Sequence, residues 1–436
     1  MRFFQLRIKE IRELLRNHDK LPSPLHKQVF PYDLTDASDE QIWFIPEIPP
    51  HEPQHAILNV SQKAMSIFEC VHARHDWFFP NIPNKQFVPD EKIVKRLRNR
   101  RLLLDELDVD MATLQAHIAN GWVSFQPGIV ANGRGYICER CGNCDRKLFA
   151  TFPCFRCKRE CVYCRSCVVM GKVTSCSPLF LWNDSHVKRA PEDNPKHVLA
   201  WDGTLSYFQQ KASDKICEAI SDFYSGNLEV DQFLVWAVCG AGKTEILFHG
   251  IELALRMGLS VLIATPRTDV VLELEPRLKE AFPEVVIHAF YGGAEDRFAQ
   301  GDLVISTTHQ LLRFYQAFDL VIIDEVDAFP YTVDEKLRWA VQNSKKEKAL
   351  TIFVTATPDE KMKRDAERGK ILSAKVARRY HRHPLPVPRN IWIGEWKNRL
   401  SKGKLPKKII AWLEKHVEAE KQIFLFVPTV RVMKEV

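Results

Sequence analysis

Lys243 and Thr244 end a glycine loop that follows the apolar run Leu234–Val238 and precedes the helix-forming run Glu245–Phe248. The backbone N–H groups of such a loop point inward at a helix N-terminus and can bind phosphate oxygens. The lysine ammonium reaches the β- and γ-phosphates, and the threonine hydroxyl coordinates Mg²⁺. The usual first glycine is replaced by Ala237. The loop predicts an ATP and Mg²⁺ site that includes Gly240, Ala241, Gly242, Lys243, Thr244 and Glu245.

Two acidic residues, Asp324 and Glu325, follow a second apolar run at Leu320–Ile323. Ligands of open α/β sheets bind outside the carboxyl ends of the strands. There Asp324 can hold the Mg²⁺ ion that bridges the phosphates, and Glu325 can orient the attacking water. We therefore predict Lys243, Asp324 and Glu325 as catalytic residues. An acidic loop that only ends a strand is the alternative.

Nine of the twelve cysteines lie between Cys138 and Cys176, which favours metal ligation in a reducing compartment over a disulfide framework. Two C-x-x-C pairs, separated by residues 142–163, have the spacing of a small zinc ribbon. The predicted zinc ligands are Cys138, Cys141, Cys164 and Cys167. Four thiolates leave no open position, so we expect a structural role for the Zn²⁺ ion. The alternatives are redox cysteines in place of this site, or a second zinc held by Cys144, Cys154, Cys157 and Cys161.

Size and composition indicate a globular protein of two to four domains, with 436 residues, 45% hydrophobic residues and a net charge of +7. The charge leans weakly toward polyanionic partners. Apolar runs are too short for a membrane span, and the charged start does not resemble a signal peptide. We expect a cytoplasmic location, with peripheral association with the cytoplasmic membrane as an alternative.

Motif positions and changes in composition divide the chain into six segments. They are an N-terminal extension of unknown role (1–90), a basic helical segment (91–135), a zinc-binding module (136–177), a linker (178–200), a first RecA-like domain (201–384) and a partial second RecA-like domain (385–436). In the second segment, six basic residues between Lys92 and Arg101 predict either a phosphate-binding helix face or a solvated one. A second helix is predicted over Met111–Ala119, ending near Gly121.

Strands and helices alternate after residue 201, which predicts an α/β fold with a parallel RecA-like sheet. Further strands are expected near residues 260–265, 304–308 and 350–355, with helices between them. Near the end of the chain, a helix over Lys408–Ala419 and a strand over Gln422–Thr429 predict the beginning of the second RecA-like domain.

Taken together, these motifs resemble those of superfamily 2 helicases. The matching segments are Ala237–Glu245 (motif I), Ala264–Asp269 (Ia), Thr307–Arg313 (Ib), Asp324–Asp327 (II) and Thr355–Pro358 (III). The cysteine segment before the motor and the longer runs Trp236–Glu245, Ala264–Leu274 and Ile323–Pro330 resemble the ComFA family. That family comprises the late-competence ATPases of DNA uptake in naturally transformable Gram-positive bacteria. The resemblance covers residues 91–436.

The resemblance implies roles for further residues. Gln209 would bind the adenine edge, with Gln210 as a substitute. Arg267, Thr308 and Arg313 would contact the backbone of single-stranded DNA, and Thr355 and Thr357 would couple nucleotide state to DNA grip. Single-stranded DNA and competence DNA-uptake proteins at the inner face of the membrane are the implied partners. Oligomerisation is left open.

Motifs V and VI do not occur in the printed sequence, so the arginine finger of the second domain is not found. Such a finger contributes about 10³- to 10⁵-fold in rate in related phosphoryl-transfer enzymes. We expect this chain to bind ATP and single-stranded DNA, to hydrolyse ATP poorly, and to be poorly soluble. The alternatives to a DNA-uptake motor are a replication-restart or repair helicase, a non-catalytic DNA-binding adaptor and, less favoured, an RNA helicase.

Overall fold

The computed structural model describes residues 3–7, 42–46, 65–66, 82–133, 135–154, 160–183, 199–294, 296–381, 387, 389–400 and 403–435. The chain forms two compact units, Met1–Arg382 and His383–Val436. Three short strands of the first ninety residues pair antiparallel in the order β2-β1-β3, with bounds Phe3–Arg7 (β1), Ile42–Pro46 (β2) and Met65–Ser66 (β3).

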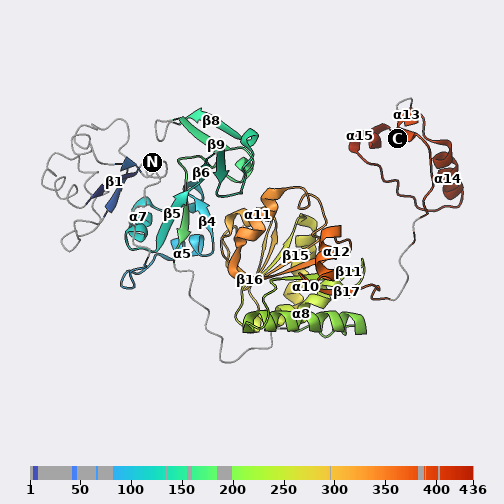
Figure 1. Ribbon diagram of the computed structural model, residues 1–436, viewed down its shortest axis with the longest axis horizontal. Coiled ribbons are helices and arrows are strands. Elements are labelled where there is room, and N and C mark those ends of the chain that lie inside the picture. The colour runs from blue at the N-terminus through green and yellow to red at the C-terminus, as the bar shows by residue number, and fades with distance from the viewer. Residues whose placement is uncertain are drawn as a thin grey trace. The chain divides into compact units, whose positions relative to one another are not determined.

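A seven-stranded parallel sheet forms the motor lobe, in the order β13-β14-β12-β15-β16-β11-β17 (Figure 1). Its strands are β11 (Gln232–Ala237), β12 (Val261–Thr265), β13 (Ile287–Phe290), β14 (Leu303–Thr307), β15 (Phe318–Asp324), β16 (Lys345–Thr355) and β17 (Leu372–Val376). The predicted RecA-like parallel sheet is therefore confirmed, although β13 and β17 were not foreseen.

The motor lobe also contains helices. They are α8 (Tyr207–Ser225), α9 (Lys243–Arg256), α10 (Thr268–Ala281), α11 (Glu335–Ser344) and α12 (Glu360–Glu367), with a short 3₁₀ turn at Gln310–Arg313. Alternate residues of β12 belong to two separate cores: Val261 and Ile263 pack with α8, α9 and α10. Leu262 packs in the other core, with α11 and with the cysteine-containing module. The cysteine-containing module thus covers part of one face of the parallel sheet, and α11 covers another part of the same face.

Residues 82–183 form one body around a small antiparallel sheet in the order β4-β10-β5. Its elements are α5 (Glu91–Leu97), β4 (Arg101–Leu103), α6 (Leu104–Leu107), α7 (Met111–Ala119), β5 (Val123–Pro127), β6 (Ile129–Asn132), β7 (Gly135–Cys138), β8 (Phe149–Pro153), β9 (Glu160–Cys164) and β10 (Pro178–Trp182), with 3₁₀ turns at Arg146–Leu148 and Val168–Met170. Helix α7 has the predicted bounds.

The beginning of the predicted linker is instead the central strand of this small sheet. β10 pairs with β4 and β5 and buries Leu179 and Phe180, which are 0% and 1% exposed. The apolar run of β10 provides the core that these short strands lack on their own. The linker prediction was therefore wrong for residues 178–182, and the predicted basic segment and zinc module share one fold.

The second unit contains three helices, α13 (Trp396–Leu400), α14 (Lys407–Glu418) and α15 (Val430–Glu435). The predicted helix agrees with α14 to within one residue at each end. The predicted strand does not form: residues 422–429 have no strand pairing, and Phe424 and Phe426 are 80% and 91% exposed. A strand needs a partner for its backbone groups, and the described part of this unit offers none.

Candidate nucleotide site and cysteine centre

The phosphate loop joins β11 to α9 and bends at two glycines. Gly240 and Gly242 have φ angles of 75° and 70°, in the left-handed region that favours glycine. A Cβ on Gly242 would lie 2.5 Å from Nε2 of Gln209, so the position also excludes larger residues on steric grounds. Helix α9 begins at Lys243, and the loop therefore ends at a helix N-terminus, where phosphate binding is favoured.

The strand register places the acidic residues at the same sheet edge as this loop. Trp236 of β11 pairs with Thr355 of β16, and Val354 pairs with Asp324 of β15. Burial raises the pKa of Asp324, and the positive charge of Lys243 opposes that shift. The lysine thus lies close enough to Asp324 for their charges to interact. A lysine and a carboxylate at one edge are the groups that a Mg²⁺–triphosphate requires.

Glu325 has an unusual backbone conformation for a non-glycine residue, with φ of 55°. Its N–H donates to Oδ1 of Asp324 at 3.0 Å. The carboxylate of Glu325 is partly exposed and lies 3.9 Å from Nε of Arg267. The carboxylate of Glu325 is thus partly open to solvent, and its role in orienting the attacking water stays a prediction.

Asp327 connects the acidic segment to the two predicted coupling threonines. Thr355 Oγ1 donates to Asp327 Oδ1 at 2.5 Å, and Thr357 donates to the other carboxylate oxygen. Burial tends to raise the pKa of Asp327, but these hydrogen bonds and the charge of Lys243 lower it overall. No role for Asp327 was predicted from the sequence. Its place as the last residue of the Asp-Glu-Val-Asp run was the available signal.

Gln209 contacts the phosphate loop directly. Its Nε2 donates to the carbonyl of Ala241 at 2.9 Å, and its Oε1 accepts from the N–H of Ser206 at 2.8 Å. Gln210 instead lies on the exposed side of α8 and donates to Asp214. The side chain of Gln209, rather than Gln210, is therefore beside the loop, and its contact with adenine stays a prediction.

The segment after β17 also contacts the phosphate loop, which sequence reasoning missed. The N–H of Tyr380 donates to the carbonyl of Gly240 at 3.0 Å. The side chain of Arg379 would touch a Cβ on Gly240, and its buried Nε has no hydrogen-bond partner among the described residues. Arg379 is therefore a further candidate phosphate ligand. Glu245, by contrast, forms an ion pair with Arg277 of α10 at 2.6 Å, so its carboxylate already has a partner within the protein.

The three predicted DNA-contact residues lie in different environments. Arg267 follows β12, is half exposed and forms an ion pair with Asp269, which raises the pKa of the guanidinium. Thr308 is fully buried. Arg313 is 11% exposed, and its Nε lies 3.1 Å from Glu106 of α6. Only Arg267 is available to a nucleic acid in this conformation, so we restrict the proposed DNA contacts to it.

The outer cysteine pairs come together between two hairpins, β6–β7 and β8–β9. The four sulfurs of Cys138, Cys141, Cys164 and Cys167 all lie within 4.8 Å of one another and are buried. Sγ of Cys138 is 3.8 Å from that of Cys167, and the Cys141–Cys164 separation is 3.7 Å. Zinc–sulfur bonds of about 2.3 Å place tetrahedral ligands about 3.8 Å apart. The four thiols therefore suit a closed zinc site.

Both cysteine knuckles contact α11 of the motor lobe. Lys336 donates to the carbonyl of Ser166, between Cys164 and Cys167, at 3.2 Å. Gly142, next to Cys141, has φ of 70° and lies so close to Trp339 that a Cβ would approach the indole to 2.4 Å. The cysteine centre is thus part of the contact between the module and the motor.

The predicted second cysteine set needs revision. Cys144 is exposed and joins no cluster of described residues, and Cys157 lies outside the described part of the chain. Cys154 and Cys161 instead lie with Cys176, and the three sulfurs are within 4.8 Å of one another. Cys176 was missed because no C-x-x-C pair marks it.

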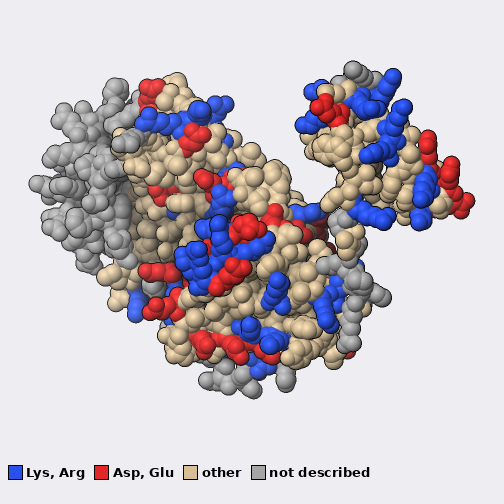
Figure 2. All heavy atoms as spheres, turned by 45° about the vertical axis from the view of Figure 1, so that its right-hand side comes forward, with Lys and Arg blue, Asp and Glu red and all other residues tan. Residues whose placement is uncertain are grey.

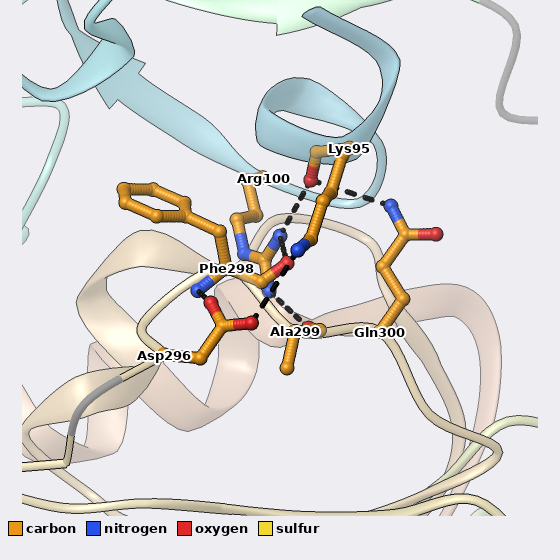
Figure 3. A network of polar contacts seen from close by, with 6 residues as sticks. All are labelled: Lys95, Arg100, Asp296, Phe298, Ala299 and Gln300. Carbon is orange, nitrogen blue, oxygen red and sulfur yellow. Dashed lines mark hydrogen bonds and ion pairs between the residues drawn. The ribbon is translucent and has the colours of Figure 1, made fainter. Parts of the chain in front are cut away.

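The basic segment before the module contacts the motor rather than forming a uniform phosphate-binding face. Arg100, 3% exposed, donates to the carbonyls of Lys95, Phe298 and Ala299 at 3.0, 3.2 and 2.7 Å (Figure 3). Burial lowers its pKa to about 10. Figure 2 shows basic and acidic side chains interleaved on the face drawn there. The sequence predicted either a phosphate-binding or a solvated helix face for this segment. Neither alternative was complete, because its most buried arginines stabilise an internal contact with the motor lobe.

The parallel sheet, the phosphate loop and the acidic residues at one edge define a helicase-like ATPase domain. Residues 202–360 match the family "Type III restriction enzyme, res subunit", and residues 85–181 match the "Competence protein ComFA N-terminal domain". The chain is 45% identical over 357 residues to the Competence protein ComFA of Bacillus subtilis (strain 168), covering 81% of this chain and 74% of that protein. The chain belongs to the ComFA family.

Two further relatives extend the comparison. The Competence protein ComFA of Streptococcus pneumoniae (strain ATCC BAA-255 / R6) is 37% identical over 270 residues, which cover 62% of this chain and 59% of that protein. The Replication restart protein PriA of Rickettsia felis is 29% identical over 209 residues, 44% of this chain and 32% of that protein. No described helix is both long and apolar enough to cross a membrane.

Proposed function

We propose that this chain is an ATP-dependent motor that moves single-stranded DNA during uptake by competent cells. The observation that carries the proposal is the shared sheet edge, where the β11–β16–β15 register aligns the phosphate loop with Asp324. Family membership supports the role in competence, since the relatives that match most of the chain are competence proteins.

The proposed chemistry uses residues of one lobe. The ammonium of Lys243 and the loop N–H groups would bind the triphosphate, Thr244 and Asp324 would hold Mg²⁺, and Glu325 would orient the attacking water. Mg²⁺ supplies charge neutralisation on the phosphates when it is bound. Arg379 adds a positive charge over Gly240. Gln209 remains the proposed adenine contact.

Coupling to DNA runs through the hydrogen bonds of Asp327. The carboxylate is three residues from the metal-binding Asp324 and accepts from both Thr355 and Thr357. A shift of the acidic segment on γ-phosphate release would therefore be transmitted to the segment after β16. Arg267 lies at the same edge, 3.9 Å from Glu325, and would hold a DNA phosphate near the hydrolysis site.

The cysteine centre has a proposed structural role. A Zn²⁺ ion on Cys138, Cys141, Cys164 and Cys167 would fix the two knuckles that contact Lys336 and Trp339 of α11. Because the four thiolates close the coordination sphere, the ion would not take part in hydrolysis.

ATP binding, DNA binding and turnover should be measured separately on the purified chain. We expect Mg²⁺–ATP binding that Lys243→Ala removes, and sequence-independent binding of labelled single-stranded DNA that salt weakens. Absence of nucleotide binding by the folded wild-type chain would refute the motor assignment.

A second candidate function is replication restart, which the similarity to PriA favours. ATP-dependent unwinding of forked duplex DNA would support it, whereas stimulation of ATP hydrolysis by single strands alone favours DNA uptake. Normal transformation of a strain with Lys243→Ala in this protein would instead indicate a non-catalytic DNA-binding adaptor.

A further inference from the structure

Cys154, Cys161 and Cys176 converge outside the predicted zinc set. They are 6%, 0% and 1% exposed, and their three sulfurs all lie within 4.8 Å of one another. Sγ of Cys154 is 3.7 Å from Sγ of Cys176, far beyond the disulfide bond length of about 2.0 Å. The separation is instead close to the tetrahedral edge of about 3.8 Å expected around zinc, as it is in the first cluster.

The chain path explains why two clusters form side by side. Cys161 and Cys164 are three residues apart on β9, and side chains separated by an odd number of positions point to opposite faces of a strand. Cys164 joins the first cluster, and Cys161 joins the second. The β8–β9 hairpin therefore presents one cysteine to each cluster.

Cys176 reaches the second cluster from a loop that is paired with β9. The N–H of Ser175 donates to the carbonyl of Val162 at 2.8 Å, and the N–H of Val162 donates to Oγ of Ser175 at 3.2 Å. The hydroxyl of Thr174 lies 3.3 Å from Sγ of Cys176 and can donate to a thiolate there. Such an outer hydrogen bond fixes a metal ligand and stabilises its charge.

We propose that Cys154, Cys161 and Cys176 bind a second structural zinc ion, each thiol losing its proton to solvent as the ion binds. The two clusters belong to different cores. The first shares a core with Leu262 and other motor residues, and the second shares one with the α5 and β10 residues of the N-terminal body. The second ion would thus link the β8–β9 hairpin to the core that contains α5 and β10. The first ion would link the same hairpin to the motor lobe.

A closed zinc site needs a fourth ligand, and the described residues supply three thiolates. Cys157 follows Cys154 by three positions in the sequence but lies outside the described residues, so it does not enter the proposed set. The competing explanation is that the three cysteines pack as small apolar side chains, as buried thiols often do.

Zinc stoichiometry of the intact chain separates these explanations. Native mass spectrometry and elemental analysis of the wild-type chain, purified without added metal, should give two zinc ions per chain. Cys176→Ser should lower the count to one, while Cys144→Ser, an exposed cysteine of the same module, should retain two. Cys138→Ser should remove the other ion and leave the second.

One zinc per wild-type chain, or two in both the wild type and Cys176→Ser, would overturn the proposal. If Cys176→Ser fails to fold, zinc X-ray absorption on the wild-type chain still decides, because two ions with sulfur-dominated coordination are expected. The result is independent of the proposed motor function, since it requires neither ATP nor DNA.

Discussion

The motor lobe and the cysteine module bury their cores by different means. The motor has seven parallel strands of 4 to 11 residues whose apolar side chains pack on both faces. The strands of the residue 82–183 body have only 3 to 5 residues, and cysteines belong to both of its cores. The motor is therefore expected to fold by hydrophobic burial alone, whereas the module is expected to depend on the proposed zinc.

Loss of the first metal ion should have the strongest effect. Zinc contributes about 10 to 16 kcal/mol to the folding of zinc-finger peptides, so Cys164→Ser should unfold the β6–β7 hairpin and the knuckle that follows it. Hydrogen exchange should then show lost protection in β6 and β7 and retained protection in β11 and β15. Cys217→Ser in α8 is the matched control and should change neither region. Equal loss of protection in the motor would contradict the inference that only the module depends on metal.

The next largest effect is the loss of stabilisation by nucleotide, which should involve the motor lobe alone. Mg²⁺–ATP at a hundred times its Kd should stabilise the wild-type chain by about 2.7 kcal/mol, and Asp324→Asn should lose this gain. Thermal unfolding with and without Mg²⁺–ATP provides the measurement, and the module's zinc content should not change.

Without nucleotide, Asp324→Asn should be at least as stable as the wild type at pH 7. Burial raises the pKa of Asp324, so this group favours folding below its ordinary pKa of 3.8. That contribution is lost as the pH rises through the higher folded value, and it is absent at neutral pH. A marked loss of stability in the nucleotide-free variant would show that the carboxylate has another structural partner.

A smaller effect is expected at the contact between the regions. Glu106 pairs with both Arg140 and Arg313, and Arg140 is 1% exposed. Arg313→Ala should lower the free energy of unfolding by about 1 to 3 kcal/mol, because Glu106 keeps one partner. Its affinity for single-stranded DNA should stay unchanged. A large loss of DNA affinity in a folded Arg313→Ala chain would restore its predicted role in DNA contact.

The smallest stability effect is expected for Arg267→Ala, because this arginine is exposed and its pair with Asp269 is at the surface. The unfolding transition should not move. Single-stranded DNA binding should weaken, and the salt dependence of log K should fall by about 0.7 for the lost phosphate contact. Fluorescence anisotropy across a salt series measures both quantities, and an unchanged slope would exclude Arg267 from the DNA path.

Local sequence patterns were enough to predict the motor fold and its main chemical groups. Continuous apolar runs ending in polar residues specify buried parallel strands, and the Gly240–Thr244 pattern specifies a phosphate loop. The two C-x-x-C pairs likewise predicted which four thiols converge, because a tight knuckle brings both sulfurs to one point. Local patterns are sufficient where neighbours in the chain form the feature.

Features that depend on distant segments of the chain could be recognised only in the folded structure. Arg313 and Arg100 look like nucleic-acid ligands in the sequence, but long-range contacts with Glu106 and Ala299 occupy them. Cys176 belongs to no C-x-x-C pair in the sequence and joins a cluster because its loop pairs with β9. The strand predicted at residues 422–429 failed for the same reason, since a strand is stabilised by its neighbours and not by its own composition.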